Sequence, residues 1–523
     1  MTMTGPTPSD AHVARPSGNA LVPAVWLATF VAFGVLLAVL YPDSYQQDGG
    51  THFLFARDAW WNHVLFVDVW GRPLFTTLYA LPALAGYLPA KLCTVVVCAL
   101  TAWHTYRWAA DEGMPRAELA IPFLVLQPAV MLLASDTMTE PLFALVFVLA
   151  LRLHRSGRIR AGMCVAALLP LARPEGFFIC LLWGVWLLAD ARLDPAWWRR
   201  ALALPILAGG VAAWWLASVL ITRDPAFLLH NWPSNWSPTG AVYGVAPWLE
   251  YWSLRYDIVS RALFVPFAVG LVMLLARRRL GTATSSVLLL FVVHSVLRHY
   301  GLFGSAGYPR YFVCVAPAFA VITLAGWNEI AGVLSLAASL LPQSRRRWMR
   351  GAITALAVVV LFLATRTALY AVDDHATARD ARAVIDANDW LRAHPVPVRQ
   401  LVWSQAYMCI LRRCDTRHRL VLTGDRAHNL ALLRATGPGT LAFWDGETGP
   451  GWYGVRGADF EAAGFRKMFD QHYDLYAQFG RRIRYPAPWV RSQEMMLYYK
   501  PGEVANAEEA GTGDGAGASS ATK

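Results

Sequence analysis

Long apolar stretches alternate with short polar loops along most of the chain. If ~20 residues are needed to cross a bilayer, these stretches predict about eleven transmembrane helices. They lie near residues 21–40, 88–108, 117–134, 139–153, 160–173, 176–190, 200–221, 258–276, 284–300, 310–330 and 351–370. The pattern therefore predicts a polytopic α-helical membrane protein whose membrane domain covers residues 21–370.

A polar segment with several threonines, prolines and serines, residues 1–20, precedes the first apolar stretch. The residues after Leu40 are Tyr-Pro-Asp-Ser-Tyr, which lack the small side chains of a signal-peptide cleavage site. We therefore expect residues 21–40 to be retained as the first span and residues 1–20 to form a cytoplasmic tail.

The composition changes beyond Tyr370. Residues 373–392 are charged, with apolar side chains at helical spacing, and short strand-like runs follow them. These runs lie at 400–403, 419–422, 440–444 and 494–499. Together they predict a small α/β domain over residues 371–500, long enough to bury a core of its own. Residues 501–523 are rich in glycine, alanine and glutamate, and we expect them to be disordered.

Two polar loops, residues 41–87 and 223–257, are too long to be simple turns. The first mixes apolar and charged side chains between His52 and Val69, which suits a helix lying along the membrane interface. The second contains Trp232, Trp236, Trp248 and Trp252. Long structured loops commonly form lids or binding surfaces, and anchoring at the interface is the alternative explanation for these tryptophans.

The loops between the apolar stretches differ in charge. One set carries arginine clusters, at 155–160, 199–200, 277–279 and 345–347, and the alternate set carries isolated carboxylates beside aromatic residues, glycines and prolines. Arginine-rich loops stay on the cytoplasmic side of a membrane. With a cytoplasmic N-terminus, an odd number of spans places the carboxylates and the C-terminal domain outside. We therefore expect a multi-pass protein of the inner or plasma membrane with an extracytoplasmic site.

The overall composition agrees with this class of protein. Hydrophobic residues make up 56% of the chain and charged residues 15%, whereas soluble domains carry roughly 25% charged residues. The net charge of +11 is also typical of nucleic-acid binding, but no basic stripe with interleaved aromatics forms a soluble module here. We therefore expect membrane lipids, and no nucleic acid, as partners.

The chain has seven cysteines, of which Cys409 and Cys414 lie in the predicted external domain. A disulfide is chemically stable outside the cell. The spacing of two cysteines does not establish that their geometry allows a bond, so a disulfide and two free thiols both stay open. The other cysteines lie within apolar stretches, where small buried side chains are expected.

Asp48 is the first candidate for chemistry. It follows the first apolar stretch and precedes two glycines and the predicted interfacial helix. A carboxylate at this position can accept a proton from an incoming hydroxyl group, which is the work of a general base. The alternative is that Asp48 caps the helix that follows it, because aspartate is a favoured N-cap residue.

Four short motifs occur in order on the predicted outer face. They are Asp48 followed by Ala56-Arg57 and Arg72-Pro73, the acidic segment 135–143, the turn Arg173-Pro174-Glu175-Gly176, and Tyr308-Pro309-Arg310-Tyr311-Phe312 with Pro317 beyond. In this order they resemble the motifs of the GT-C superfamily of polytopic glycosyltransferases. The likeness is greatest to its protein O-mannosyltransferase and aminoarabinose-transferase branch, and it covers roughly residues 20–330. No single motif is specific; the order and the common face carry the resemblance.

The resemblance implies a hexosyltransferase reaction in which a sugar leaves a polyprenyl-phosphate donor and joins an acceptor hydroxyl with inversion. The acceptor would be a protein, a glycan or a lipid. Asp48 is then the expected base, and cations should bind the departing phosphate, where negative charge grows. The candidates, in descending order, are Arg310, Arg72, Arg173, His299 and Arg57. For each arginine the alternative is a side chain at the end of a span that reaches the lipid headgroups.

One departure from the family pattern concerns Gly49, which stands where many relatives carry a glutamate next to the aspartate. The resemblance therefore leaves a second carboxylate to come from Asp43, Asp136 or Glu140, or to be dispensable. If both Asp136 and Glu140 are helical, their spacing places them on one helical face; the alternative is a pair that begins the following span, where the helix dipole favours acids.

Other functions and cofactors stay open at this point. Some relatives use a divalent cation, but no His, Asp or Glu spacing here requires one, and we assign no residue as a metal ligand. A transporter or lipid flippase usually places ionisable residues within its spans, whereas here most candidates lie at predicted span ends. A membrane scaffold, the third alternative, would leave the acidic loop without a function.

Overall fold

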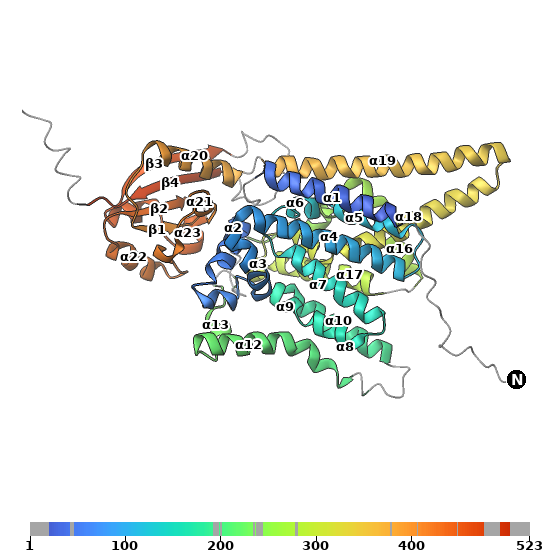
Figure 1. The fold of residues 1–523 in the computed structure, drawn as a ribbon, viewed down its shortest axis with the longest axis horizontal. Helices are drawn as coiled ribbons and strands as arrows, with labels where there is room; N and C mark the ends of the chain where they lie inside the picture. Colours follow the sequence, from blue (N-terminus) through green and yellow to red (C-terminus); the bar gives the residue numbers. More distant parts are fainter. Residues whose placement is uncertain are drawn as a thin grey trace, which may run out of the picture.

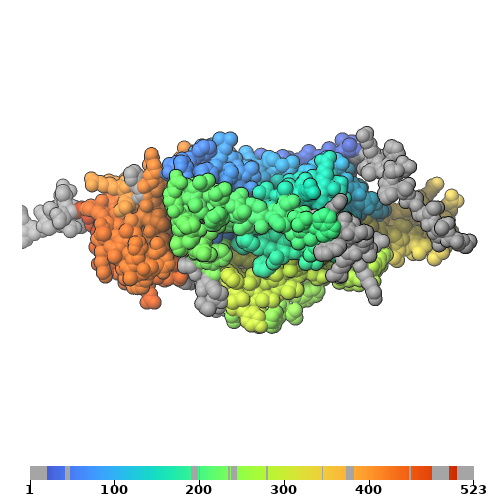
Figure 2. Space-filling view, turned by 90° about the horizontal axis from the view of Figure 1, so that it is seen from below, coloured from blue at the N-terminus to red at the C-terminus, as the bar shows by residue number. Residues whose placement is uncertain are grey.

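A bundle of apolar helices continues at one end into an α/β domain (Figure 1). The computed structural model describes residues 20–41, 47–191, 198, 201–233, 236, 244–277, 281–376, 379–404, 406–446, 448–474 and 492–502. The molecule is elongated, with the α/β domain, in orange, towards one end of its long axis (Figure 2).

The bundle is built from residues 21–376. Its main helices are α1 (Leu21–Leu40), α2 (Gln47–Asp58), α3 (Pro73–Ala85), α4 (Tyr87–Asp111), α5 (Ala120–Val125), α6 (Pro128–Leu133), α7 (Glu140–Arg155), α8 (Ile159–Ala166), α9 (Leu169–Ala172), α10 (Glu175–Ala191), α12 (Gly209–Thr222), α13 (Phe227–His230), α14 (Glu250–Ser253), α15 (Arg255–Val259), α16 (Arg261–Ala276), α17 (Thr282–Tyr300), the 3-10 turn η6 (Pro309–Val315), α18 (Ala316–Ser339) and α19 (Gln343–Ala376). Among the described residues, six helical stretches are long and apolar enough to cross a membrane, and four shorter helices are apolar as well. These are the helices of an integral membrane protein.

Two stretches that the apolar pattern predicts as single spans are interrupted. Residues 117–134 divide into α5 and α6, because Gln127 precedes Pro128 and takes an extended conformation (ψ 126°) that ends a helix. Residues 160–173 divide into α8 and α9, with a proline near the start of α9. Residues 73–85, predicted as part of an external loop, form the apolar helix α3. The number of spans therefore stays a prediction.

Helices α16 and α18 approach so closely that their backbones touch at glycines. A Cβ atom on Gly326 would overlap the carbonyl oxygen of Pro266, and one on Gly270 would overlap that of Ile322. Close packing of this kind holds helices together in lipid, where burial of apolar surface supplies little driving force. Gly332, on the same helix as Gly326, has open space where a Cβ would lie.

We expect Gly326→Ala to destabilise the protein by about 1–3 kcal/mol, because the added methyl group must push two backbones apart. The melting temperature of the purified protein in detergent measures the effect. Gly332→Ala is the matched control on α18 and should change stability by no more than about 0.5 kcal/mol. Equal melting temperatures for the two variants would contradict this packing.

The C-terminal domain is built on a four-stranded sheet with the order β1-β2-β4-β3. Its elements are α20 (Arg379–Ala393), β1 (Gln400–Trp403), α21 (Ala406–Leu411), α22 (Arg426–Ala435), β2 (Thr440–Asp445), α23 (Thr448–Tyr453), α24 (Gly457–Ala462), β3 (Arg466–Asp474) and β4 (Ser492–Tyr499). β1 pairs with β2 in parallel, and β4 pairs antiparallel with both β2 and β3. Side chains alternate along β2, so that Leu441 and Phe443 join the large core of the protein, while Ala442 and Trp444 lie in a separate core.

Three of the predicted strands are present as β1, β2 and β4. The fourth prediction, residues 419–422, is wrong: this segment makes a single bridge between Arg419 and Leu401 at the edge of β1. Strand β3 was not predicted.

The C-terminal domain contacts the bundle through α21, which packs on α2. Gly50 of α2 lies against the backbone of Tyr407 and the side chain of Ile410. At the other end of α2, Arg57 donates hydrogen bonds to the carbonyl oxygen of Cys414 and to the Thr416 hydroxyl. The start of α19, which carries the arginine cluster at 345–347, lies far from this domain (Figure 1). The α/β domain and that cluster thus occupy opposite ends of the molecule.

Candidate active site

Asp48 lies in the first turn of α2. Its Oδ2 atom accepts a 2.5 Å hydrogen bond from the guanidinium of Arg310, which lies in η6 at the entry to α18. Among the described residues, the carboxylate therefore binds a guanidinium and no backbone N–H of its own helix. The pairing joins the first and the last of the four sequence motifs.

The acidic segment Asp136–Glu140 runs beside the start of α2, where the Thr137 hydroxyl donates a 2.7 Å hydrogen bond to the carbonyl oxygen of Gly49. Glu140 is the first residue of α7, where the helix dipole favours a carboxylate. Asp136 lies before this helix, so the two acids do not share a helical face. Instead, Asp136 accepts hydrogen bonds from the Tyr87 hydroxyl at 3.1 Å and from the backbone N–H of Thr137 at 2.7 Å.

The turn between α9 and α10 places a buried arginine beside a buried glutamate. Arg173 is extended (φ −163°, ψ 154°), the conformation that a following proline favours. Gly176 allows α10 to begin directly against α9, because a Cβ there would overlap the backbone of Leu169. As a result, Arg173 and Glu175 form two parallel hydrogen bonds of 2.9 and 3.2 Å, the strong bidentate arrangement of this ion pair.

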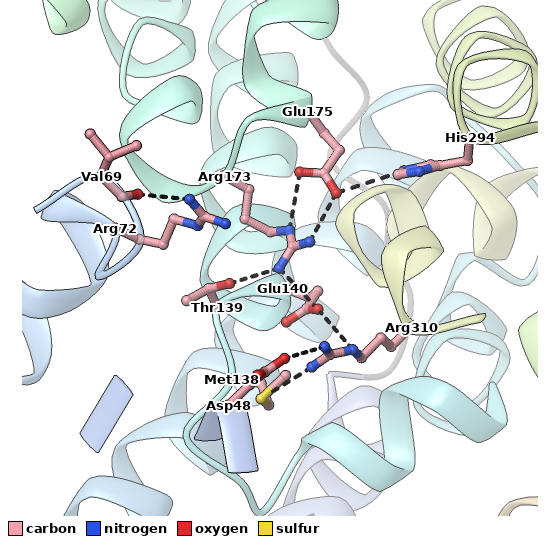
Figure 3. A network of polar contacts seen from close by, with 10 residues as sticks. All are labelled: Asp48, Val69, Arg72, Met138, Thr139, Glu140, Arg173, Glu175, His294 and Arg310. Atoms are coloured by element: carbon pink, nitrogen blue, oxygen red, sulfur yellow. Dashed lines mark hydrogen bonds and ion pairs between the residues drawn. The ribbon is translucent and has the colours of Figure 1, made fainter. Parts of the chain in front are cut away.

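These side chains form one row of polar groups in which acids and bases alternate (Figure 3). The row runs His294, Glu175, Arg173, Glu140, Arg310, Asp48. Three further contacts link the row: His294 Nε2 lies 3.7 Å from Glu175 Oε1, Arg173 lies 3.0 Å from Glu140, and Arg310 Nε lies 3.7 Å from Glu140. Each guanidinium lies between two carboxylates, which offsets the cost of burying its charge.

The three carboxylates of the row differ in access. The side chains of Glu140 and Glu175 are 0% and 8% exposed, whereas that of Asp48 is 31% exposed. Glu140 and Glu175 are thus enclosed by protein, and Asp48 is the carboxylate that a substrate can reach.

Arg72 lies beside the row and begins α3, with a positive φ of 62°. Its guanidinium donates a 2.7 Å hydrogen bond to the carbonyl oxygen of Val69 and lies 4.4 Å from the ring centre of Trp236. Burial lowers the pKa of Arg72 to about 9, and the charge of Arg173 adds to this effect, so the side chain stays charged at neutral pH. Within the part of the chain that the structure describes, no carboxylate pairs with it and its Nε has no partner. We call Arg72, Arg173 and Arg310 the site arginines.

His52 is a buried site residue that none of the sequence motifs indicates. It follows Asp48 by four residues, which places both on one face of α2, and its ring stacks on Trp70 with 4.4 Å between ring centres. Burial holds the pKa of His52 well below its usual value, and the charges of the site arginines lower it further. The imidazole is therefore neutral at pH 7, and among the described residues its Nδ1 has no hydrogen-bond partner.

Besides Arg72 and Asp136, three predicted site residues are not in the row. Asp43 lies outside the described residues. His299 stacks on Trp248 and contacts the carbonyl oxygen of Ala246 at 2.9 Å. Arg57 pairs with its neighbour Asp58 and faces the C-terminal domain.

A second buried ion pair, also not predicted, lies next to His299. Arg298 donates a 2.7 Å hydrogen bond to Glu250, and both side chains are buried. Gly307, with a φ of +77°, passes so close that a Cβ would lie 3.0 Å from the Arg298 Nε. This pair therefore ties residues 244–253 to the segment that leads into Arg310. Nothing in the spacing of these residues marks them as partners, because they meet only through the tertiary fold.

Among the described residues, no group of three or more His, Cys, Asp or Glu side chains is arranged to hold a metal ion. The site is instead defined by its guanidinium and carboxylate groups.

Comparison with solved structures identifies the fold. Over 90% of this chain and 98% of theirs, two crystal structures of ArnT from Cupriavidus metallidurans are similar to it. The structure bound to undecaprenyl phosphate has a TM-score of 0.56 at 15% sequence identity, and the apo structure has 0.55 at 14%. No protein-family model and no curated protein sequence matches the chain. The resemblance drawn from the four motifs is thus confirmed at the level of architecture: the chain has the GT-C fold of the aminoarabinose transferase ArnT.

Proposed function

We propose that the protein is a membrane glycosyltransferase that moves a sugar from a polyprenyl-phosphate donor to an acceptor hydroxyl on the extracytoplasmic side, with inversion. The observation that carries the proposal is a row of buried charges ending at the accessible Asp48, beside the cation Arg72, which has no carboxylate partner among the described residues. ArnT binds undecaprenyl phosphate in one of the similar structures, which agrees with a lipid-phosphate donor.

In this proposal Asp48 accepts the proton of the acceptor hydroxyl while its oxygen attacks the anomeric carbon of the sugar. The bond between that carbon and the phosphate oxygen breaks on the opposite face, and its electron pair leaves with the polyprenyl phosphate. Because attack and departure occur on opposite faces, the configuration inverts. Cations near the departing phosphate stabilise the charge that develops there.

Arg310 has two roles in the proposed cycle. In the free protein it holds Asp48 at 2.5 Å, and its Nε lies 3.7 Å from the enclosed Glu140. A donor phosphate competes with Asp48 for the outer nitrogen of the guanidinium, while Glu140 keeps the side chain in place. Binding of the donor thereby frees the Asp48 carboxylate to accept a proton.

Transport of a lipid is the second candidate function. Transporters commonly place ionisable residues near the middle of their spans. In this row the carboxylates Asp48, Glu140 and Glu175 each lie in the first turn of a helix. Carboxylates that lie together at the ends of helices favour a catalytic site at the membrane surface over a transport path through the bilayer.

The direct test is transfer by the purified protein in lipid nanodiscs, supplied with a panel of radiolabelled polyprenyl-phosphate sugars and a membrane extract as acceptor. We expect label to move from at least one donor to the acceptor fraction and free polyprenyl phosphate to accumulate in equal amount. Movement of an intact donor between leaflets of a liposome, without cleavage, would favour the transporter instead.

Arg72→Ala should raise the KM for the donor about 10- to 100-fold with a smaller effect on kcat, because a charge-assisted contact to the phosphate is lost. Initial rates at varied donor concentration measure this. Arg223→Ala removes an exposed cation at the end of α12 and is expected to leave KM within about twofold, since exposed charges contribute little. An equal rise in KM for both variants would mean that general charge, and not Arg72, attracts the donor.

A further inference from the structure

The cysteines Cys409 and Cys414 occupy matched positions in the turn that ends α21. The backbone N–H of Cys414 donates a 2.9 Å hydrogen bond to the carbonyl oxygen of Cys409, and that of Arg413 donates to Ile410 at 3.2 Å. Arg413 has a positive φ of 51°. These features define the Schellman motif of a helix C-terminus, in which the side chains at the positions of Cys409 and Cys414 frequently contact each other.

The geometry of this turn suits a disulfide. A 2.9 Å hydrogen bond between the two backbones keeps the Cα atoms within the roughly 7 Å that a disulfide spans. The Sγ atom of Cys409 lies 3.8 Å from the carbonyl oxygen of Cys414. Both thiols are free in this structure, and a hydrogen bond from Cys409 lowers the pKa of Cys414. Cys414 is partly exposed and Cys409 is buried, so an oxidant meets Cys414 first.

This turn is also the contact between the C-terminal domain and the helix that carries Asp48. Arg57 of α2 donates a hydrogen bond to the carbonyl oxygen of Cys414, and α21, which contains Cys409, packs against Gly50 of α2. Arg413 holds a left-handed conformation that glycine adopts more easily. A covalent bond across the turn would keep this strained contact in one shape.

We infer that Cys409 and Cys414 form a disulfide that closes the turn at the end of α21, where this turn contacts α2. Each thiol loses its proton, the two sulfurs together give up two electrons, and an external disulfide accepts both electrons and both protons to become two thiols. The bond requires that the domain lie outside the cytoplasm, where thiols are not kept reduced. It does not require that the protein transfer sugars, so it holds or fails independently of the proposed function.

Peptide mapping tests the bond directly. Membranes are denatured with N-ethylmaleimide and without reductant, and the protein is cut with trypsin. Because cleavage at Arg412 and Arg413 separates the cysteines, a disulfide joins peptide 400–412 to peptide 414–417. We expect this linked pair, lighter by two hydrogens than the sum of its parts, and its loss in Cys414→Ser. Alkylation of both cysteines in the wild type, or linkage of either to another cysteine, would overturn the inference.

A second measurement tests whether the disulfide stabilises this contact. Reductant should lower the melting temperature of the wild type by several degrees, because opening the loop restores entropy to the unfolded chain. The double variant Cys409→Ser/Cys414→Ser should melt lower and show no response to reductant. Cys98→Ala, which removes a buried cysteine of α4, should keep the response. A wild type that melts at the same temperature with and without reductant would show that the bond does not stabilise this contact.

Discussion

Asp48→Asn is expected to lower kcat for sugar transfer by about 10²- to 10⁴-fold, because the amide cannot accept the proton of the acceptor hydroxyl. The KM for the donor should not rise, since the phosphate is bound by Arg72 and Arg310 and the amide competes for Arg310 less strongly than the carboxylate does. The fold should persist: Arg310 keeps its contact with Glu140, and asparagine is close to aspartate in volume. Initial rates with the active donor, beside a melting curve of each protein, separate a loss of chemistry from a loss of folding.

Asp58→Asn is the matched control. Asp58 ends the same helix, α2, and pairs with Arg57 outside the row of charges. Its replacement should leave kcat within a few-fold of the wild type. If Asp48→Asn transfers as fast as Asp58→Asn, the base is a different group, and the neutral His52 on the same helical face becomes the next candidate.

The apolar pattern predicts most of the helices because lipid and helix length constrain them strongly. The stretches at 21–40, 88–108 and 284–300 appear as α1, α4 and α17 with boundaries close to those expected. The pattern fails where a proline interrupts an apolar run, as at Pro128, because hydropathy alone does not register a backbone break. The sequence does indicate this break, since the residue before a proline avoids the helical conformation.

Strand β3 was missed for a different reason. Its residues, Arg466–Asp474, are mostly charged or polar and show no regular alternation. β3 lies at the edge of the sheet, beyond β4, where solvent replaces one set of neighbours and polar side chains are favoured. Only the partner strand determines that this segment is extended, and a local pattern does not contain that information.

The motifs predicted which parts of the chain meet, but not how they pair. Asp48, Glu140, Arg173 and Arg310 do lie together, as their common predicted face implies. The sequence does not distinguish Arg173, enclosed by two glutamates, from Arg72, which has no carboxylate partner among the described residues. That difference arises from the turns in which the two arginines lie, and it decides which of them is available to a substrate anion.

Glu140→Gln is expected to destabilise the protein by roughly 3–5 kcal/mol, the cost of leaving buried charge without its partner. Glu140 is fully buried and lies 3.0 Å from Arg173 and 3.7 Å from Arg310. Loss of its charge raises the net charge of the three site arginines and the three carboxylates of the row from zero to +1, at a position, that of Glu140, which solvent does not reach. Unfolding in mixed micelles, followed by tryptophan fluorescence, measures the change.

The control is Glu329→Gln, which breaks the exposed pair of Glu329 with Arg277 at 2.6 Å. Exposed pairs contribute about 0–1 kcal/mol to stability. Comparison of the two variants therefore separates the effect of burial from the effect of losing an ion pair. If Glu140→Gln is no more destabilising than Glu329→Gln, water or counter-ions reach the row and its charges are not enclosed. Arg173 would then be as free to bind a phosphate as Arg72 is, and the distinction drawn between these two arginines would not hold.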